Sequence, residues 1–270
     1  AKEIDEVLMG CALCAGLGQS PARQASLKAG ISNTTSCTTI NKVCGSGMKA
    51  IMLGYDLLRA GSNKIVVAGG MESMTNTPYL LDKARQGYRL GHGQIKDHLF
   101  LDGLEDAYET GKLMGVFADR TAQKYKITRK AQDEYAFNSL GRALDATKKK
   151  LFLTDYEITP ITIPLPKNQI IHIDQDEQPS RVDPKKIPTL KPAFHDNGTV
   201  TAASSSSISD GAAALVLMPH SEAKKRGLKP LAKILGHASY AEEPQWFTTA
   251  PVGAIKKLLK KLEWAPTVPD

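Results

Sequence analysis

The chain has 270 residues, 41% of them hydrophobic, which is enough to bury a substantial core in one or two domains. Its formal net charge is +7, but the lysines fall in short clusters and only 6% of the residues are aromatic, so nucleic-acid binding is not expected. The longest apolar runs, such as residues 212–218, are too short to span a bilayer, and no membrane association is expected.

Residues 1–5 carry no signal-peptide pattern, and a cytoplasmic location is the expectation. An organellar matrix stays open, because the chain begins without methionine and a transit segment could have been removed.

Strand and helix signals alternate over the first 70 residues. Apolar, β-branched stretches predict strands near 6–13, 37–43 and 64–68, and helices are expected near 20–30 and 46–60. The alternation predicts an α/β fold with a mostly parallel sheet that is covered on its faces.

A cysteine lies between the second of these strands and the helix that follows. Cys44 precedes Gly45, Ser46 and Gly47, so it is expected where the amide N–H groups of a helix start converge. The partial positive charge there favours thiolate over thiol, and the same amides can hold an oxyanion when the sulfur attacks a carbonyl. Taken alone, a buried structural cysteine at a tight turn is the alternative interpretation.

The other three cysteines are interpreted as reduced structural thiols. Cys11 and Cys14 have the spacing of metal knuckles and redox pairs, but no second such pair occurs. A strand over these residues would also direct the two side chains to opposite faces. Neither a metal site nor a disulfide framework is therefore expected.

The amino-acid composition of the chain changes after about residue 74. Glycine, charge and histidine fill 85–101, a polar helix is expected over 129–149 after the cap Thr128, and proline and charge dominate 164–192. The serine run 204–207 is expected to form an ordered turn. Strand signals resume at 212–218, where the sequence is apolar enough to need cover on both faces, and a helix is expected over 254–262.

Residues 41–50 resemble the nucleophile motif of the thiolase family almost letter for letter. Further segments resemble other signatures of the family in the same order, namely 69–79, 113–118, 191–194, 198–203 and 206–214. Residues 10–24 are similar to the acetoacetyl-CoA, biosynthetic branch. This ordered agreement covers essentially the whole chain.

The resemblance implies a layered thiolase-like fold with an inserted loop domain. Residues 1–73 would belong to the N-terminal thiolase domain, and 74–200 to a loop domain that binds coenzyme A and carries an oligomerisation arm near 85–100. Residues 201–270 would complete the N-terminal domain and begin the C-terminal one.

The resemblance also implies roles for six residues. These are Cys44 as the catalytic nucleophile, Met114, Phe194, Ser206 and Ile208 as pantetheine contacts, and Arg181 near the nucleotide end of coenzyme A. From the residues alone, the apolar members of this set could be core and Arg181 a surface cation. Leu113 and Ser204 depart from the histidine and the asparagine that are common in the family.

The implied activity is acyl transfer: the reversible condensation of two acetyl-CoA to acetoacetyl-CoA and CoA, or thiolysis of 3-ketoacyl-CoA, through an acetyl-cysteine on Cys44. Acetyl-CoA, acetoacetyl-CoA and CoA are the expected small-molecule partners, in lipid metabolism and fatty acid β-oxidation. A homodimer or homotetramer is expected, with no redox cofactor and no catalytic metal. Two alternatives stay open, a β-ketoacyl synthase relative and a non-catalytic thiolase fragment that binds CoA or dimerises.

Three motifs of the family do not occur in the chain. They are a histidine in a Gly-His-Pro context, an Asn-Glu-Ala-Phe segment, and a second cysteine in Cys-x-Gly-Gly. The sequence thus resembles the middle of a thiolase, and these 270 residues alone are not expected to be active.

Overall fold

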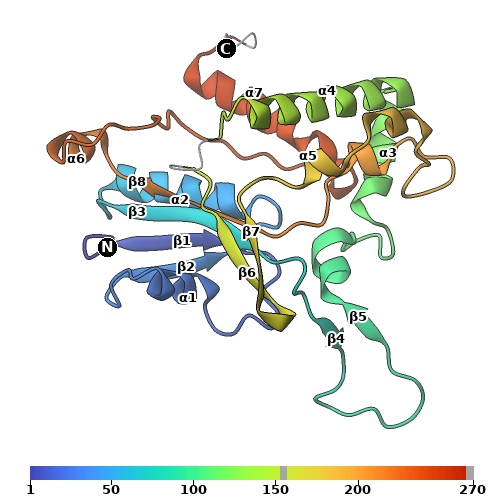
Figure 1. The fold of residues 1–270 in the computed structure, drawn as a ribbon, viewed down its shortest axis with the longest axis horizontal. Helices are drawn as coiled ribbons and strands as arrows, with labels where there is room; N and C mark the ends of the chain where they lie inside the picture. Colours follow the sequence, from blue (N-terminus) through green and yellow to red (C-terminus); the bar gives the residue numbers. More distant parts are fainter. Residues whose placement is uncertain (153–156, 266–270) are drawn as a thin grey trace. The chain divides into compact units, whose positions relative to one another are not determined.

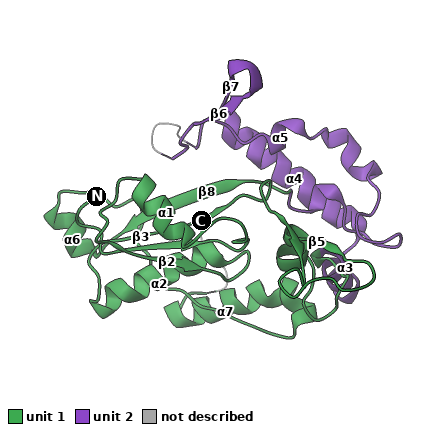
Figure 2. Ribbon diagram, turned by 90° about the horizontal axis from the view of Figure 1, so that it is seen from below, with its two compact units in different colours: residues 1–114, 208–270 green, residues 115–207 purple. Residues whose placement is uncertain are grey.

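The computed structural model describes residues 1–152 and 157–265 and groups the chain into two compact units (Figures 1 and 2). Unit 1 comprises Ala1–Met114 and Ile208–Asp270, and unit 2 comprises Gly115–Ser207. The predicted loop domain overlaps unit 2, while residues 74–114 group with unit 1. The proposed domain boundaries at 73 and 200 stay predictions.

Unit 1 is built on a four-stranded sheet of order β2-β1-β3-β8. The strands are β1 (Glu6–Gly10), β2 (Ser36–Ile40), β3 (Val66–Glu72) and β8 (Gly211–Leu217), and the first two helices are α1 (Pro21–Lys28) and α2 (Ser46–Ala60). β1 pairs with β2 and β3 in parallel, and β8 pairs with β3 in the antiparallel sense. The predicted α/β fold with a mostly parallel sheet is confirmed.

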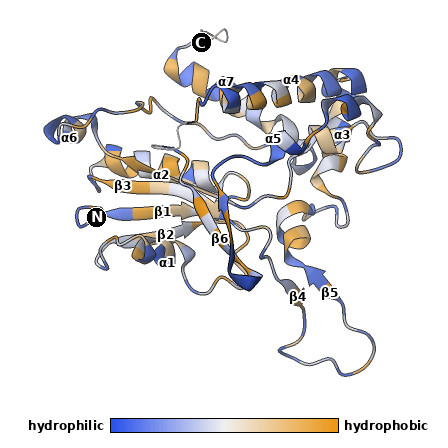
Figure 3. Cartoon of the chain, viewed as in Figure 1, coloured by the Kyte–Doolittle hydropathy of each residue, from blue (hydrophilic) through white to orange (hydrophobic). Residues whose placement is uncertain are grey.

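The two helices cover opposite faces of the sheet. Leu8 of β1 shares a buried cluster with Ala50 of α2, whereas the neighbouring Val7 shares one with Ala22 of α1. Successive residues of a strand point to opposite faces, so the two clusters lie on the two sides of β1. Figure 3 shows hydrophobic colours along β3 and over part of β1.

Strand β8 is less covered than its apolar sequence predicts. Leu215 is 47% exposed and Val216 is 62% exposed, although both lie in the sheet. Among the described residues, the expected cover on both faces of this strand is therefore not complete.

Two strands end earlier than their apolar sequences predict, because side chains capture the backbone that follows. β1 ends at Gly10, and the Glu72 carboxylate accepts hydrogen bonds from the N–H groups of Ala12 and Leu13. β2 ends at Ile40, and residues 41–45 form a turn.

The remaining elements of unit 1 are short or helical. They are β4 (Tyr79–Leu81), β5 (Ile95–Asp97), the π-helix η1 (Phe100–Leu104), α6 (His220–Lys225), the 3-10 helix η5 (Pro244–Thr249) and α7 (Ala250–Leu262). β4 and β5 form an antiparallel pair. The helix predicted over 254–262 begins four residues earlier, since Pro251 suits the first turn of a helix.

Unit 2 contains two long helices, one hairpin and several short turns. Its elements are α3 (Met114–Lys124), α4 (Arg129–Lys148), β6 (Ile161–Leu165), η2 (Pro166–Asn168), β7 (Gln169–Ile173), α5 (Gln178–Arg181), η3 (Pro184–Thr189) and η4 (Ala202–Ser204). The polar helix was predicted almost to the residue, and the Thr128 side chain caps it by accepting a hydrogen bond from the Ala131 N–H. The mainly hydrophilic colours of α4 in Figure 3 agree with its single buried residue, Ala136.

Within the described part of the chain, none of the helices combines the length and the apolar content that a membrane crossing requires.

Candidate active site

Cys44 lies in a tight, exposed turn between β2 and α2. The helix begins at Ser46 with Gly45 as its N-cap, so Cys44 lies just before the helix start. The Gly45 N–H donates to the Lys42 carbonyl (3.0 Å), and the Ser46 N–H donates to the Val43 carbonyl (3.1 Å). Val43 has a φ of 47°, a left-handed conformation that is rare for a β-branched residue. The expected placement of Cys44 at a helix N-terminus is seen.

The start of α2 lies directly on the backbone of two strands. A Cβ atom at Gly10 of β1 would fall 2.4 Å from the backbone nitrogen of Gly47. One at Gly70 of β3 would fall 3.1 Å from the Cα atom of Gly47. A side chain at Gly10 would force the helix to move, and one at Gly70 would be in tight contact with it, so this close approach fixes the helix start at this point of the sheet.

The four cysteines are free, and they differ in accessibility. Cys44 is exposed, Cys14 and Cys37 are half-buried, and Cys11 is buried. Burial raises the pKa of the Cys11 thiol to about 12, and a hydrogen bond from this thiol to Cys14 and the nearby Glu72 carboxylate act in the same direction. Cys44 is therefore the thiol most open to a reagent or substrate.

The loop after β1 lies beside the Cys44 turn and is held by three side chains. The Glu72 carboxylate accepts from Ala12 and Leu13 at 2.9 and 3.0 Å, and the Asn41 amide donates to the Ala12 carbonyl at 3.2 Å. Buried His98 accepts from the Ala15 N–H through Nε2 (3.4 Å), which leaves Nδ1 to donate to Asp102 (2.6 Å). Sequence reasoning missed these anchors.

The proposed pantetheine and nucleotide contacts lie on both units. Met114 is half-buried at the start of α3, and Ile208 is exposed at the boundary of unit 1. In unit 2, Ser206 is exposed, and Arg181 forms a surface ion pair with Glu177 (2.7 Å).

Phe194 is the member of this set with the most defined surroundings. Its half-buried ring lies over the start of α3, where a Cβ atom at Gly115 would fall 2.1 Å from the ring. Within unit 2, the structure thus brings Phe194 to the residue that follows Met114. The binding roles of all five residues stay predictions.

A buried carboxylate of α3 holds the segment that follows Phe194. Asp119 Oδ1 accepts from the N–H groups of Thr199 (2.6 Å) and Val200 (2.9 Å). Its other oxygen lies 3.4 Å from Nε2 of His195. The next residue, Thr201, is fully buried and forms a capping box with Ser204, so the serine run begins in an ordered turn, as predicted.

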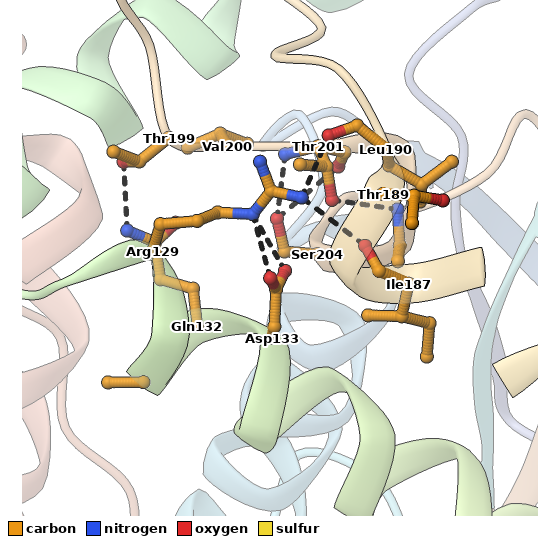
Figure 4. A network of polar contacts seen from close by, with 12 residues as sticks. Arg129, Gln132, Asp133, Ile187, Thr189, Leu190, Thr199, Val200, Thr201 and Ser204 are labelled. Carbon is orange, nitrogen blue, oxygen red and sulfur yellow. Dashed lines mark hydrogen bonds and ion pairs between the residues drawn. The ribbon is translucent and has the colours of Figure 1, made fainter. Parts of the chain in front are cut away.

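Helix α4 holds the same part of unit 2 from its first turn (Figure 4). The Arg129 guanidinium contacts both oxygens of Asp133 at 2.9 Å and donates to the carbonyls of Ile187 (3.2 Å) and Leu190 (2.8 Å). The Gln132 amide donates to the hydroxyl of Thr199 (2.9 Å). These contacts fix the two ends of the segment that carries Phe194.

No group of three or more His, Cys, Asp or Glu side chains that could hold a metal ion gathers within residues 1–152 and 157–265.

The fold and the site together define a class of protein: an α/β unit with an exposed cysteine at a strand-to-helix turn. The sequence matches the family described as thiolase, N-terminal domain, over residues 1–221. The chain belongs to the thiolase family.

Several relatives and solved structures are similar over nearly the whole chain. The probable acetyl-CoA acetyltransferase of Dictyostelium discoideum is 48% identical over 96% of the chain and 62% of the relative, and the acetyl-CoA acetyltransferase of Schizosaccharomyces pombe is 45% identical over 96% and 65%. The crystal structure of the Acat5 thiolase from Ascaris suum in complex with coenzyme A is 39% identical, with a TM-score of 0.89 over 98% of the chain and 67% of that structure. The chain thus spans less than two thirds of the length of these two curated relatives.

Proposed function

We propose that the protein containing this chain is an acyltransferase that interconverts two acetyl-CoA with acetoacetyl-CoA and CoA. The observation that carries the proposal is the exposed Cys44 thiol at the start of α2, beside glycine-to-backbone packing that fixes its position. The acetyl-CoA acetyltransferase names of the similar proteins support the same chemistry.

In the first half-reaction, the Cys44 thiolate attacks the carbonyl carbon of acetyl-CoA. A carbon–sulfur bond forms to Cys44, the bond to the CoA sulfur breaks, and CoA leaves as a thiol with the proton that Cys44 gave up. The amide N–H groups at the start of α2 would hold the oxyanion that forms when the sulfur attacks.

In the second half-reaction, another acetyl-CoA loses an α-proton and its carbon attacks the acetyl-Cys44 carbonyl. A carbon–carbon bond forms, the acetyl–sulfur bond breaks, and Cys44 is released as the free thiol once it regains a proton. Thiolysis of a 3-ketoacyl-CoA is the same sequence run backward.

The proposal assigns the contacts with coenzyme A to five residues. Met114, Phe194, Ser206 and Ile208 would contact pantetheine, and Arg181 would exchange its Glu177 partner for the phosphate or adenine end. The complex of the Ascaris suum thiolase with coenzyme A supports a CoA thioester as substrate.

Assembly, location and pathway complete the proposal. A homodimer or homotetramer would form with help from the arm near 85–100, where Leu90 is fully exposed. The protein would act in the cytoplasm or an organellar matrix, in lipid metabolism that includes β-oxidation.

The direct test is detection of an acetyl-enzyme. The protein is incubated with acetyl-CoA, and peptide mass mapping should find one acetyl group on the Cys44 peptide. Cys44→Ala should abolish that adduct while leaving CoA binding intact, because the sulfur serves the chemistry more than affinity. Cys37→Ala is the matched control and should retain the adduct.

The alternatives give different results in the same experiment. Acetylation from an acyl-carrier-protein thioester in preference to acetyl-CoA would identify a β-ketoacyl synthase relative. CoA binding without acetylation of Cys44 would contradict the enzyme proposal and favour a non-catalytic thiolase fragment.

A further inference from the structure

The turn that carries Cys44 depends on two side chains that are not needed for the chemistry itself. Four backbone groups flank the left-handed Val43 residue: the N–H and carbonyl of Lys42, and the N–H and carbonyl of Val43. The two carbonyls accept from backbone N–H groups, Lys42 from Gly45 (3.0 Å) and Val43 from Ser46 (3.1 Å), and the two N–H groups are held by side chains.

The Ser46 hydroxyl contacts one N–H group and one carbonyl of this set. Its Oγ accepts from the Lys42 N–H (2.8 Å) and donates to the Val43 carbonyl (2.5 Å). The side chain is buried, with only 4% of the residue exposed, so no water replaces it readily. Because the Val43 carbonyl belongs to the same planar peptide as the Cys44 nitrogen, holding that carbonyl sets the direction of Cys44.

Asn41 satisfies the other N–H group. Its Oδ1 accepts from the Val43 N–H (2.9 Å), an Asx-type contact two residues ahead, and its Nδ2 donates to the Ala12 carbonyl (3.2 Å). The amide therefore joins the turn to the loop that Glu72 holds.

We infer that Ser46 and Asn41 are positioning residues that hold Val43 in its left-handed conformation and so present the Cys44 sulfur at the start of α2. The left-handed conformation is unfavourable for a β-branched residue and persists only where surrounding contacts impose it. Without these contacts, the turn relaxes and the sulfur leaves the helix N-terminus. The inference rests on the proposed role of Cys44 as nucleophile.

The test measures the rate of Cys44 alkylation by limiting iodoacetamide in the full chain, with the labelling of Cys11, Cys14 and Cys37 followed in the same sample. Ser46→Ala should slow Cys44 labelling about tenfold, the effect expected from losing a buried hydroxyl that makes two hydrogen bonds. Labelling of the other three cysteines should not rise. General unfolding would have the opposite signature, since it would expose those three.

The matched control is Ser26→Ala. Ser26 is also buried, at 2% exposure, and its hydroxyl has no hydrogen-bond partner among the described residues. Its removal should leave the Cys44 labelling rate within twofold of that of the unmodified chain.

Variants of Asn41 form a second series of tests, and because Asn41 is exposed, they do not require a change to a buried residue. Asn41→Ala should slow Cys44 labelling about fivefold, from the loss of one turn contact. Asn41→Ser should restore most of the rate, because a neutral hydroxyl can accept from the same N–H group. This series decides the inference if Ser46→Ala does not fold.

Equal Cys44 labelling rates in the unmodified chain and in the Ser46→Ala or Asn41→Ala variant would overturn the inference. That result is distinct from failure of the proposed function, in which the unmodified protein would not form acetyl-Cys44. If acetylation occurs, Ser46→Ala should slow it about tenfold while CoA affinity stays within twofold.

Discussion

The Cys44 turn and the proposed coenzyme A contacts are built in opposite ways. The turn is fixed by backbone-to-backbone packing at Gly10 and Gly70 and by the buried Ser46. Among the proposed CoA contacts, Arg181 lies on a four-residue helix and Ile208 is 54% exposed. The comparison indicates that the Cys44 turn is placed by the core, whereas two of the proposed ligand contacts, Arg181 and Ile208, lie on surface segments.

The largest effect is expected where the core meets the turn. Gly10→Ala would place a Cβ atom 2.4 Å from the backbone of α2, so the helix must move away from the sheet. We expect a loss of about 3 kcal/mol in the free energy of unfolding, measured by urea denaturation. The rate at which Cys44 is labelled by iodoacetamide should change in the same variant.

Gly211→Ala is the control for this substitution, because a Cβ atom at Gly211 meets nothing within 4 Å. Its effect should stay within about 0.5 kcal/mol. A Gly10→Ala protein as stable as the Gly211→Ala protein would show that the close approach does not fix the helix.

A smaller effect is expected at the surface contacts. If the Arg181 guanidinium meets the phosphate or adenine end of CoA, Arg181→Ala should raise KM for CoA thioesters about tenfold with little change in kcat. The effect should shrink for short pantetheine thioesters. Equal changes with both substrates would remove Arg181 from the nucleotide end.

The sequence predicted the elements of the central sheet better than it predicted the hairpin of unit 2. The helix from Ser46 to Ala60 and the parallel strands followed from apolar periodicity, because burial decides both. The hairpin β6–β7 was missed, since its isoleucines are interrupted by proline and polar residues and four of the five are exposed.

The site was predicted in the same uneven way. Cys44 followed from the motif and from its place before a helix, whereas the left-handed Val43 did not, because the conformation arises from contacts with Ser46 and Asn41. The end of β1 was placed three residues too late, since the Glu72 carboxylate that captures the loop lies about sixty residues away in the sequence. Contacts between distant residues have no local pattern.

The smallest effect is expected at the opposite end of the strands from Cys44. Asp5 Oδ2 accepts from the N–H groups of Ile65 (2.9 Å) and Lys64 (2.7 Å), and these bonds lower the pKa of the Asp5 carboxyl. A lowered pKa stabilises the fold above the ordinary value of 3.8, and this contribution is lost as the pH falls through the folded value.

Asp5→Asn should therefore reduce stability at neutral pH by less than about 1 kcal/mol, since the side chain is exposed and solvent-screened. The difference should shrink in strong acid. Urea midpoints of both proteins, measured from neutral pH into acid, test this, and a difference that grew on acidification would contradict it.

The most direct test of the central claim is the order in which the four thiols react. Brief exposure to limiting iodoacetamide, followed by peptide mass mapping, should label Cys44 first, because it is exposed at a helix start. Cys11 should react last, since its thiol is buried and its pKa is raised to about 12. Preferential labelling of Cys11, Cys14 or Cys37 would contradict the assignment of Cys44 as the displayed nucleophile.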